Sequence, residues 1–165
     1  MTECPFCRRI RDPSAEAGRL LFEDDLLWVA HELEEEGPTY RGMVAIVLKR
    51  HGEGGLSEMT DEEGARIGQA VARVARAFRS VLGVPWAYTY CFTEGFRHVH
   101  QFVVARYPGV PDRYVRLGLQ AWPGAPRGDE AEIRNLVGRL RAAMGVPSEP
   151  GGTSPEPGRP SGNDD

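Results

Sequence analysis

The sequence predicts an α+β fold in which an antiparallel sheet of about five strands packs with two main helices. Several short apolar runs are typical of strands, and two longer segments repeat apolar residues at helical spacing. The order of these elements is also informative, because residues 87–104 contain two strand-like runs with no helix between them. Parallel neighbours need a long crossover connection, so this order favours antiparallel pairing.

The first helix is expected to begin near Asp61. Thr60 and Glu63 match a capping box, and the acidic first turn suits the positive end of the helix dipole. Gly83 and Pro85 end the helical pattern. The apolar stripe consists of Ile67, Val71, Val74, Phe78 and Val81. The arginines of this segment lie mostly off the stripe, and we interpret them as a solvated face.

The expected strands cover residues 26–30, 43–48, 87–92 and 98–104. The run at 43–48, MVAIVL, is apolar on both faces, which predicts a central strand. A second helix is expected over about residues 129–144, with Gly145 ending it. Residues 108–126, which precede that helix, are rich in loop-forming residues.

The composition fits one domain followed by a tail. A chain of 165 residues leaves little room for a second core. In residues 147–165, nine of 19 residues are Gly or Pro and none is a large apolar residue. Such a segment cannot bury enough surface to offset the entropy lost on ordering it. We therefore expect a folded domain at 1–146 and a disordered Pro/Gly-rich tail at 147–165.

Charge and hydropathy exclude several classes of protein. The net charge is −4, of which the tail carries −3, so the sequence lacks the basic surface of an extended nucleic-acid platform. No apolar run approaches the roughly 20 residues of a membrane span, and the N-terminus does not resemble a signal peptide. We therefore expect a cytoplasmic protein with no membrane partner.

The positions of cysteine and histidine predict a metal site. Cys4 and Cys7 form a CxxC pair that supplies two thiolates from one turn. His51 follows the run at 43–48, and His98 opens a later strand. In a reducing compartment a CxxC pair favours a metal or redox site over a structural disulfide. Two thiolates and two imidazoles have the number and softness that tetrahedral Zn²⁺ prefers. The alternative is a reduced thiol pair that binds nothing.

His100 lies two residues beyond His98, and strand geometry places both on one face with Phe102. If His98 holds a metal, the imidazole of His100 is fixed beside the site and is free to react. An imidazole with a pKa of ~6.5 is partly neutral at pH 7 and can attack phosphorus or relay protons. One ring nitrogen must then be bonded to an acceptor, so that the other presents its lone pair.

Four segments resemble the histidine-triad (HIT) superfamily of nucleotidyl hydrolases and transferases. They stand in the family's order: CPFC at 4–7, FEDDLLWVAHE at 22–32, GMVAIVLKRH at 42–51 and HVHQFVVARYPGVP at 98–111. The family patterns for the last two are close to G-H-x-L-V-I-P-K-R-H and to H-x-H-x-H followed by two apolar residues. The resemblance implies a HIT-like fold, a nucleotide or nucleotide conjugate as partner, and a homodimer. It also implies a structural zinc ion with the ligands Cys4, Cys7, His51 and His98.

The resemblance further implies roles for the residues around a substrate. His100 falls on the central histidine, which in active members attacks the α-phosphorus and forms a nucleotidyl-histidine intermediate. Glu32 falls on the acidic residue, normally Asp, that hydrogen-bonds the ribose hydroxyls; the alternative is a solvated charge in the acidic run at 32–36. The remaining expected substrate-binding residues are Leu33, Thr93, Arg97 and Phe102. His31 is assigned no role.

Two positions depart from the family pattern. Phe102 stands at the third histidine of the triad, and Met43 stands at an upstream histidine. Gln101 lies one residue before the third triad position and faces away in a regular strand. The loop at 93–97 is shorter than the family's Gly-rich phosphate-binding stretch, and Arg97 is a candidate to contact phosphate in its place. Losing one such contact costs roughly 2–4 kcal/mol in the barrier, which slows an enzyme without abolishing its chemistry.

Three functions fit these residues. The first is a hydrolase or nucleotidyltransferase that acts through His100 on the α-phosphate of a nucleotide phosphoanhydride or phosphoramidate. The second is a HIT domain without catalysis that binds a nucleotide or a protein partner, which the apolar Met43 and Phe102 favour. The third, a CxxC redox protein, leaves His51 and the strand at 98–104 unexplained and is ranked last.

Overall fold

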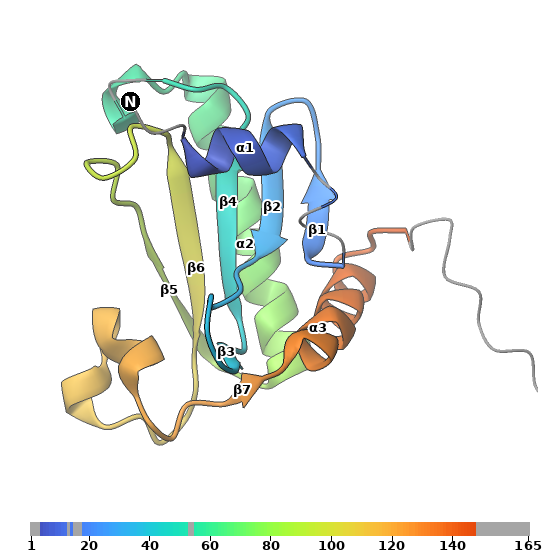
Figure 1. Ribbon diagram of the computed structural model, residues 1–165, viewed down its shortest axis with the longest axis vertical. Helices are drawn as coiled ribbons and strands as arrows, with labels where there is room; N and C mark the ends of the chain where they lie inside the picture. Colours follow the sequence, from blue (N-terminus) through green and yellow to red (C-terminus); the bar gives the residue numbers. More distant parts are fainter. Residues whose placement is uncertain (1–3, 13, 15–17, 53–54, 148–165) are drawn as a thin grey trace, which may run out of the picture.

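The computed structural model describes residues 4–12, 14, 18–52 and 55–147. The main feature of the protein is a five-stranded sheet in the order β1-β2-β4-β6-β5, in which every neighbouring pair is antiparallel (Figure 1). The strands are β1 (Leu20–Glu23), β2 (Leu27–His31), β4 (Met43–Leu48), β5 (Trp86–Tyr90) and β6 (His100–Arg106). The predicted α+β class with an antiparallel sheet is confirmed.

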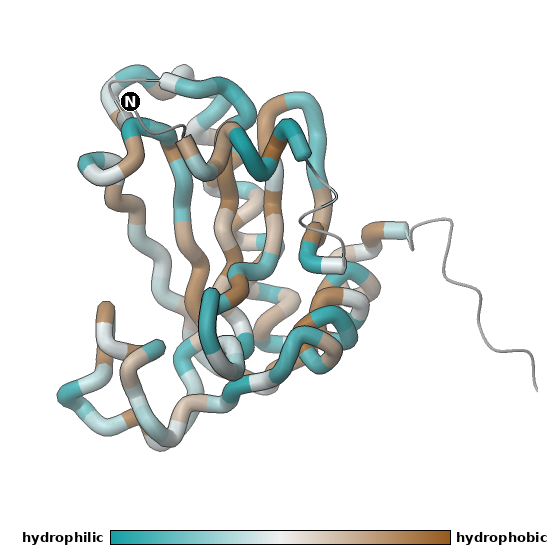
Figure 2. The backbone as a smooth tube through the Cα atoms, in the orientation of Figure 1, coloured by the Kyte–Doolittle hydropathy of each residue, from teal (hydrophilic) through white to brown (hydrophobic). Residues whose placement is uncertain are grey.

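Helices cover both faces of the sheet. α2 (Asp61–Leu82) and α3 (Glu130–Ala143) pack on one face, where their apolar residues join those of the strands in one large core. Apolar residues recur along the central strands and alternate with polar residues along these helices (Figure 2). The other face carries α1 (Pro5–Arg11), which crosses in front of β4 and β2 in Figure 1. The 3-10 helices η3 (Asp112–Tyr114) and η4 (Arg116–Ala121) belong to a separate cluster toward the opposite end of that face.

The two predicted helices are confirmed. The capping box of Thr60 and Glu63 is present at the start of α2, and Gly83 ends that helix in the left-handed conformation at φ 68°. A second capping box, formed by Asp129 and Glu132, begins α3. β4 is the middle strand of the sheet, as its apolar residues on both faces predict.

One short helix and three short strands are not predicted by the sequence: α1, β1, and β3 (Thr39–Tyr40) with its partner β7 (Arg127–Gly128). α1 has seven residues and no side-chain cap, and the three strands have two to four residues each. Segments of this length are too short to establish a hydrophobic period. Three predicted strands also have different bounds. β2 begins and ends one residue later than expected, β5 runs from Trp86 to Tyr90, and β6 begins and ends two residues later than expected.

The disordered tail expected at 147–165 lies outside the described residues, apart from Pro147. The boundary of the folded domain at residue 146 stays a prediction. Within the described ranges, no helix combines the length and the apolar character required to cross a membrane.

Candidate metal centre and active site

Four side chains from three separate segments converge at one end of the sheet. Cys4 is the N-cap of α1, and Cys7 lies in the first turn of that helix. His51 follows β4, and His98 precedes β6. The ligand atoms of all four lie within 4.8 Å of one another. The structure therefore brings together the two thiols and two imidazoles that the sequence singles out.

The distances between these atoms fit a four-coordinate ion. Sγ of Cys7 lies 3.3 Å from Nδ1 of His51 and 3.5 Å from Nδ1 of His98. The two Nδ1 atoms are 3.2 Å apart, and Sγ of Cys4 is 3.4 Å from Nδ1 of His98. A tetrahedral zinc ion with bonds of about 2.3 Å to sulfur and about 2.0 Å to nitrogen separates its ligand atoms by roughly 3.3–3.8 Å. Both the donor types and their spacing therefore fit zinc.

The backbone of β4 orients the ring of His98. Its Nε2–H donates to the carbonyl oxygen of Leu48 at 2.5 Å, which leaves the lone pair of Nδ1 facing the cluster. Burial lowers the pKa of His98, and the neutral imidazole is the form that ligates a metal. This tautomer and protonation state are those that a metal ligand requires.

Arg50 ties the loop that carries His51 to the start of α2. Its Nε and Nη2 donate to the two carboxylate oxygens of Glu63 at 2.9 and 3.0 Å, and Nη2 also donates to the carbonyl oxygen of Glu58 at 3.0 Å. The hydrogen bond from Arg50 is the largest cause that lowers the pKa of Glu63 to about 2. Because Glu63 also closes the capping box of α2, this ion pair connects that helix to the residue preceding His51.

His100 lies next to the cluster with one ring nitrogen bonded to the backbone. The carbonyl oxygen of His98 can only accept, so Nδ1–H of His100 donates to it, at 2.8 Å, and Nε2 carries the lone pair. Burial lowers the pKa of His100, although the nearby carboxylate of Glu32 acts in the opposite direction. A neutral imidazole with a fixed tautomer is the form that can attack an electrophile.

Two phenyl rings contact the imidazole of His100, which is 3% exposed. The ring of Phe6, from α1, lies at a centroid distance of 4.4 Å and an interplanar angle of 31°. The ring of Phe102 meets it edge-on at 5.2 Å and 79°. His100 and Phe102 thus share one face of β6, as the two-residue period of a strand predicts. Gln101 instead hydrogen-bonds Thr89 of β5, and the pairing of β6 with both neighbours is regular.

Glu32, directly after β2, forms an ion pair with α1. Nη1 of Arg9 donates to both carboxylate oxygens of Glu32, at 2.9 and 3.0 Å. The side chains of Arg9 and Glu32 are 25% and 16% exposed, so this pair is largely shielded from solvent. Cζ of Arg9 also lies 5.9 Å from the ring centroid of Phe6. The contacts of Glu32 therefore differ from those of a solvated charge in an acidic run.

Solved structures resemble this chain, although no protein-family model and no curated protein sequence matches it. A zinc-bound histidine triad family protein from Mycobacterium smegmatis aligns with a TM-score of 0.63 and 23% identity, over 87% of this chain and 94% of its own. A HIT-like protein involved in cell-cycle regulation, from Bartonella henselae, gives a TM-score of 0.62 and 16% identity over 86% of this chain and 96% of its own. A hypothetical histidine triad nucleotide-binding protein from Sulfolobus tokodaii gives a TM-score of 0.62 and 17% identity, over 86% of this chain and 92% of its own. The chain has the histidine-triad fold.

The HIT-like fold expected from the sequence motifs is thereby confirmed. A zinc-bound protein of the same fold and the four converging donors both fit a zinc site in this chain. The two departures from the HIT pattern lie in mainly apolar surroundings. Sδ of Met43 contacts the side-chain amide of Gln120, and Phe102 packs on Tyr90 at a centroid distance of 5.6 Å.

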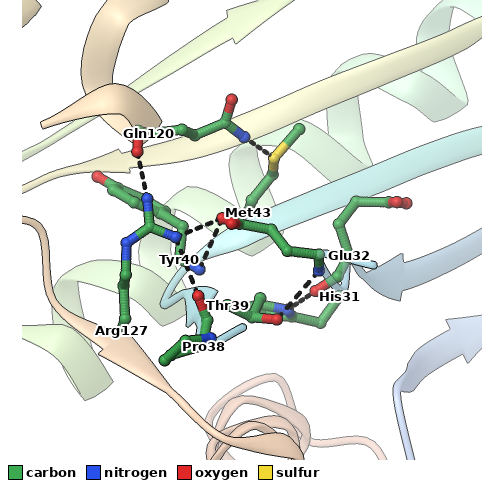
Figure 3. Close-up of polar contacts among 9 residues, drawn as sticks. His31, Glu32, Pro38, Thr39, Tyr40, Met43, Gln120 and Arg127 are labelled. Atoms are coloured by element: carbon green, nitrogen blue, oxygen red, sulfur yellow. Dashed lines mark hydrogen bonds and ion pairs between the residues drawn. The ribbon is translucent and has the colours of Figure 1, made fainter. Parts of the chain in front are cut away.

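A cavity of about 200 Å³ adjoins Glu32 on the face of the sheet that carries α1. Figure 3 shows several of the residues around it. Its lining is Glu32, Leu33, Glu34, Thr39, Tyr40, Met43 and Gln120. Arg127 links β7 to the segment between β2 and β3, because its Nη1 donates to Glu34 at 2.6 Å and to the carbonyl oxygen of Pro38 at 3.0 Å (Figure 3). Cavities that enclose a whole drug-sized ligand measure about 300–1,000 Å³, so this one holds a smaller group.

The other two expected substrate-binding residues, Thr93 and Arg97, lie in the segment that joins β5 to β6. Thr93 packs against η2 (Gly55–Glu58), where a Cβ at Gly55 would lie 2.6 Å from its Oγ1. Arg97 is exposed, and it makes no hydrogen bond or ion pair within the described part of the chain. Their roles toward a substrate stay predictions.

His31, which the sequence gives no reason to single out, is completely buried and bonded at both ring nitrogens. Figure 3 shows its ring beside Glu32. Nδ1–H donates to the carbonyl oxygen of Glu32 at 2.6 Å, and Nε2 accepts the N–H of Gly42 at 2.9 Å. Burial lowers the pKa of His31 to about 4, so the ring is neutral at pH 7. His31 thus joins the backbone at Glu32 to the turn that precedes Met43.

Proposed function

We propose that this chain is a zinc-containing HIT protein that hydrolyses or transfers a nucleotidyl group through His100. The observation that carries the proposal is the hydrogen bond from Nδ1 of His100 to the carbonyl oxygen of His98. It supports attack by Nε2, because the lone pair of that nitrogen is then fixed in direction without the need to lose a proton first.

The proposed metal ligands are Cys4, Cys7, His51 and His98. When bound, a zinc ion with four protein ligands leaves no position for water, so it supplies structural cross-linking rather than a metal-bound nucleophile. Through its two cysteines it would hold α1 against the end of β6, where Phe6 touches His100.

The proposed reaction takes place in two steps. Nε2 of His100 forms a bond to the α-phosphorus while the bond from phosphorus to the leaving group breaks, and the leaving group departs with the electron pair. Water or another acceptor then attacks the same phosphorus, which releases the nucleotide and restores the neutral imidazole. The substrate class that fits is a nucleotide phosphoanhydride or phosphoramidate.

The proposed substrate site extends from His100 to Glu32 and the adjoining cavity. A carboxylate offers about four lone-pair positions, so Glu32 can accept hydrogen bonds from both ribose hydroxyls in addition to those from Arg9. Leu33 and Met43 give the cavity apolar surface for part of the nucleoside.

The test is to incubate the protein with adenosine polyphosphates and AMP-amidates and to measure its mass and the release of AMP. The wild type is expected to give a nucleotidyl adduct or released AMP, and His100→Ala is expected to give neither while it retains zinc. Gln101→Ala is the matched control, because Gln101 lies on the same strand and bonds to Thr89 instead of the site. Undiminished turnover by His100→Ala would reject His100 as the nucleophile.

A second candidate is a HIT domain that binds a nucleotide or a protein partner without catalysis. The packing of Phe6 and Phe102 around a nearly inaccessible His100 favours it. In that case the wild type would bind nucleotide or a protein yet yield neither adduct nor AMP. A redox protein, the third candidate, would contain reactive thiols and no metal.

We further propose that the protein is a homodimer. This proposal rests on the resemblance to the HIT family, whose members are commonly dimers. Light scattering on the purified protein tests it directly. A mass of one chain, 18.2 kDa, at all concentrations would reject the dimer. The cytoplasmic location likewise stays a prediction.

A further inference from the structure

We infer that Arg9 binds the phosphate of the nucleotide and supplies the positive charge that the apolar Met43 and Phe102 do not. The inference rests on the proposed function, because it names the residue that recognises phosphate in the same site. It differs from the sequence-based candidate for this contact, Arg97, which is exposed in the segment between β5 and β6.

The first argument is the position of Arg9 on α1. Phe6 and Arg9 are three residues apart, so both project toward the same side of the helix. The ring of Phe6 contacts the imidazole of His100 at 4.4 Å between centroids, and the guanidinium carbon of Arg9 lies 5.9 Å from the same phenyl centroid. The cation and the proposed nucleophile therefore both neighbour one phenyl ring.

The second argument is the bond between Arg9 and Glu32. One nitrogen of the guanidinium, Nη1, contacts both carboxylate oxygens. In a nucleotide the ribose and the 5′-phosphate are directly joined, so a residue that contacts the ribose-binding carboxylate also lies near the phosphate. A guanidinium is planar and carries five N–H donors, a geometry that matches phosphate oxygens.

The third argument is the balance of charge. A phosphate placed between Glu32 and His100 would face a carboxylate, and a like charge at short range is unfavourable unless a cation compensates it. Arg127, a cation beside the cavity, lies against other groups: it donates to Glu34 and to the carbonyl oxygens of Pro38 and Gln120 (Figure 3). Arg9 is already paired with Glu32 and partly exposed, so it can compensate both anions from one position.

The experiment compares the binding of nucleoside 5′-monophosphates with that of the corresponding nucleosides by calorimetry. The four common monophosphates are tested on the wild type, and the one bound most tightly is then used, with its nucleoside, on three variants. Arg9→Gln removes the charge, Arg9→Lys keeps the charge without the planar geometry, and Arg8→Gln is the control. Arg8 lies on the same helix and is exposed. Zinc content is measured for each variant, so that a loss of the fold at α1 is detected.

We expect the wild type and Arg8→Gln to bind the monophosphate about tenfold or more tightly than the nucleoside, as a charged hydrogen bond to phosphate supplies. Arg9→Gln is expected to lose most of this preference while its zinc content stays close to wild type. Arg9→Lys should retain part of the preference. If Arg9→Gln keeps the full preference, the inference is wrong although the proposed function stands. If the wild type binds none of the monophosphates or nucleosides, both the inference and the proposed function are wrong.

Discussion

Acid should destabilise this protein through His31, because that ring is buried in its neutral form. Both ring nitrogens are engaged, one as a donor to the Glu32 carbonyl oxygen and one as an acceptor from Gly42 N–H. Protonation of Nε2 would replace an accepted hydrogen bond with two N–H groups that point at each other. It would also place a charge where the side chain has no exposed surface.

The size of the effect follows from the two pKa values. Burial lowers the pKa of His31 to about 4, whereas an unfolded histidine titrates near 6.5. A lowered pKa means that the unfolded chain binds the proton first, so this stabilisation is complete above about pH 6.5 and is lost as the pH falls toward 4. Between pH 7 and pH 5 the loss from this single residue is about 2 kcal/mol.

Urea denaturation at pH 7, 6 and 5 measures this loss, with His31→Gln as the comparison. Glutamine does not titrate, and both proteins carry the same zinc ligands, so protonation of the metal site cancels in the difference between them. The free energy of unfolding of the wild type should fall by about 2 kcal/mol more than that of His31→Gln over this range. Parallel curves for the two proteins would refute the reasoning.

Three further predictions concern stability and metal binding. Gly42→Ala should lower the free energy of unfolding by about 3 kcal/mol, because φ is +94° and the added Cβ would lie 2.8 Å from another Cβ; Gly68→Ala, with open space around it, is the control and should not destabilise. Glu63→Gln should weaken zinc binding about 10-fold or more in competition with a chromophoric chelator, because Arg50 then holds the segment before His51 less firmly; an unchanged affinity would contradict this. Removal of zinc with a chelator should lower the melting temperature in a scan, reversibly on adding zinc, since the ion links α1 to the sheet; an identical melting temperature would argue against that link.

Local chemistry explains which elements can be predicted from the sequence. The limits of α2 follow from residues that act within one turn: Thr60 and Glu63 cap its start, and Gly83 ends it. The central place of β4 follows from apolar residues on both faces. The metal cluster could be predicted because the sequence contains only three cysteines and four histidines, and thiolates and imidazoles are the ligands that zinc prefers.

Tertiary contacts explain what could not be predicted. α1 is a seven-residue helix without a side-chain cap, and its contacts depend on docking Phe6 against the sheet. The pairing of Arg9 with Glu32 joins residues 23 apart and exists only once that helix is docked. His31 could be assigned no role from the sequence, because its contacts include the backbone N–H of Gly42, which only the fold brings to its ring.

The central claim is that two thiolates and two imidazoles from distant segments hold one ion beside His100. Zinc analysis combined with X-ray absorption at the zinc edge tests it on the purified protein. The claim predicts one zinc per chain with two sulfur ligands and two nitrogen ligands, and loss of the metal in Cys7→Ser. A protein purified under reducing conditions and supplied with zinc that still holds none, or that binds it through oxygen ligands alone, would contradict the claim.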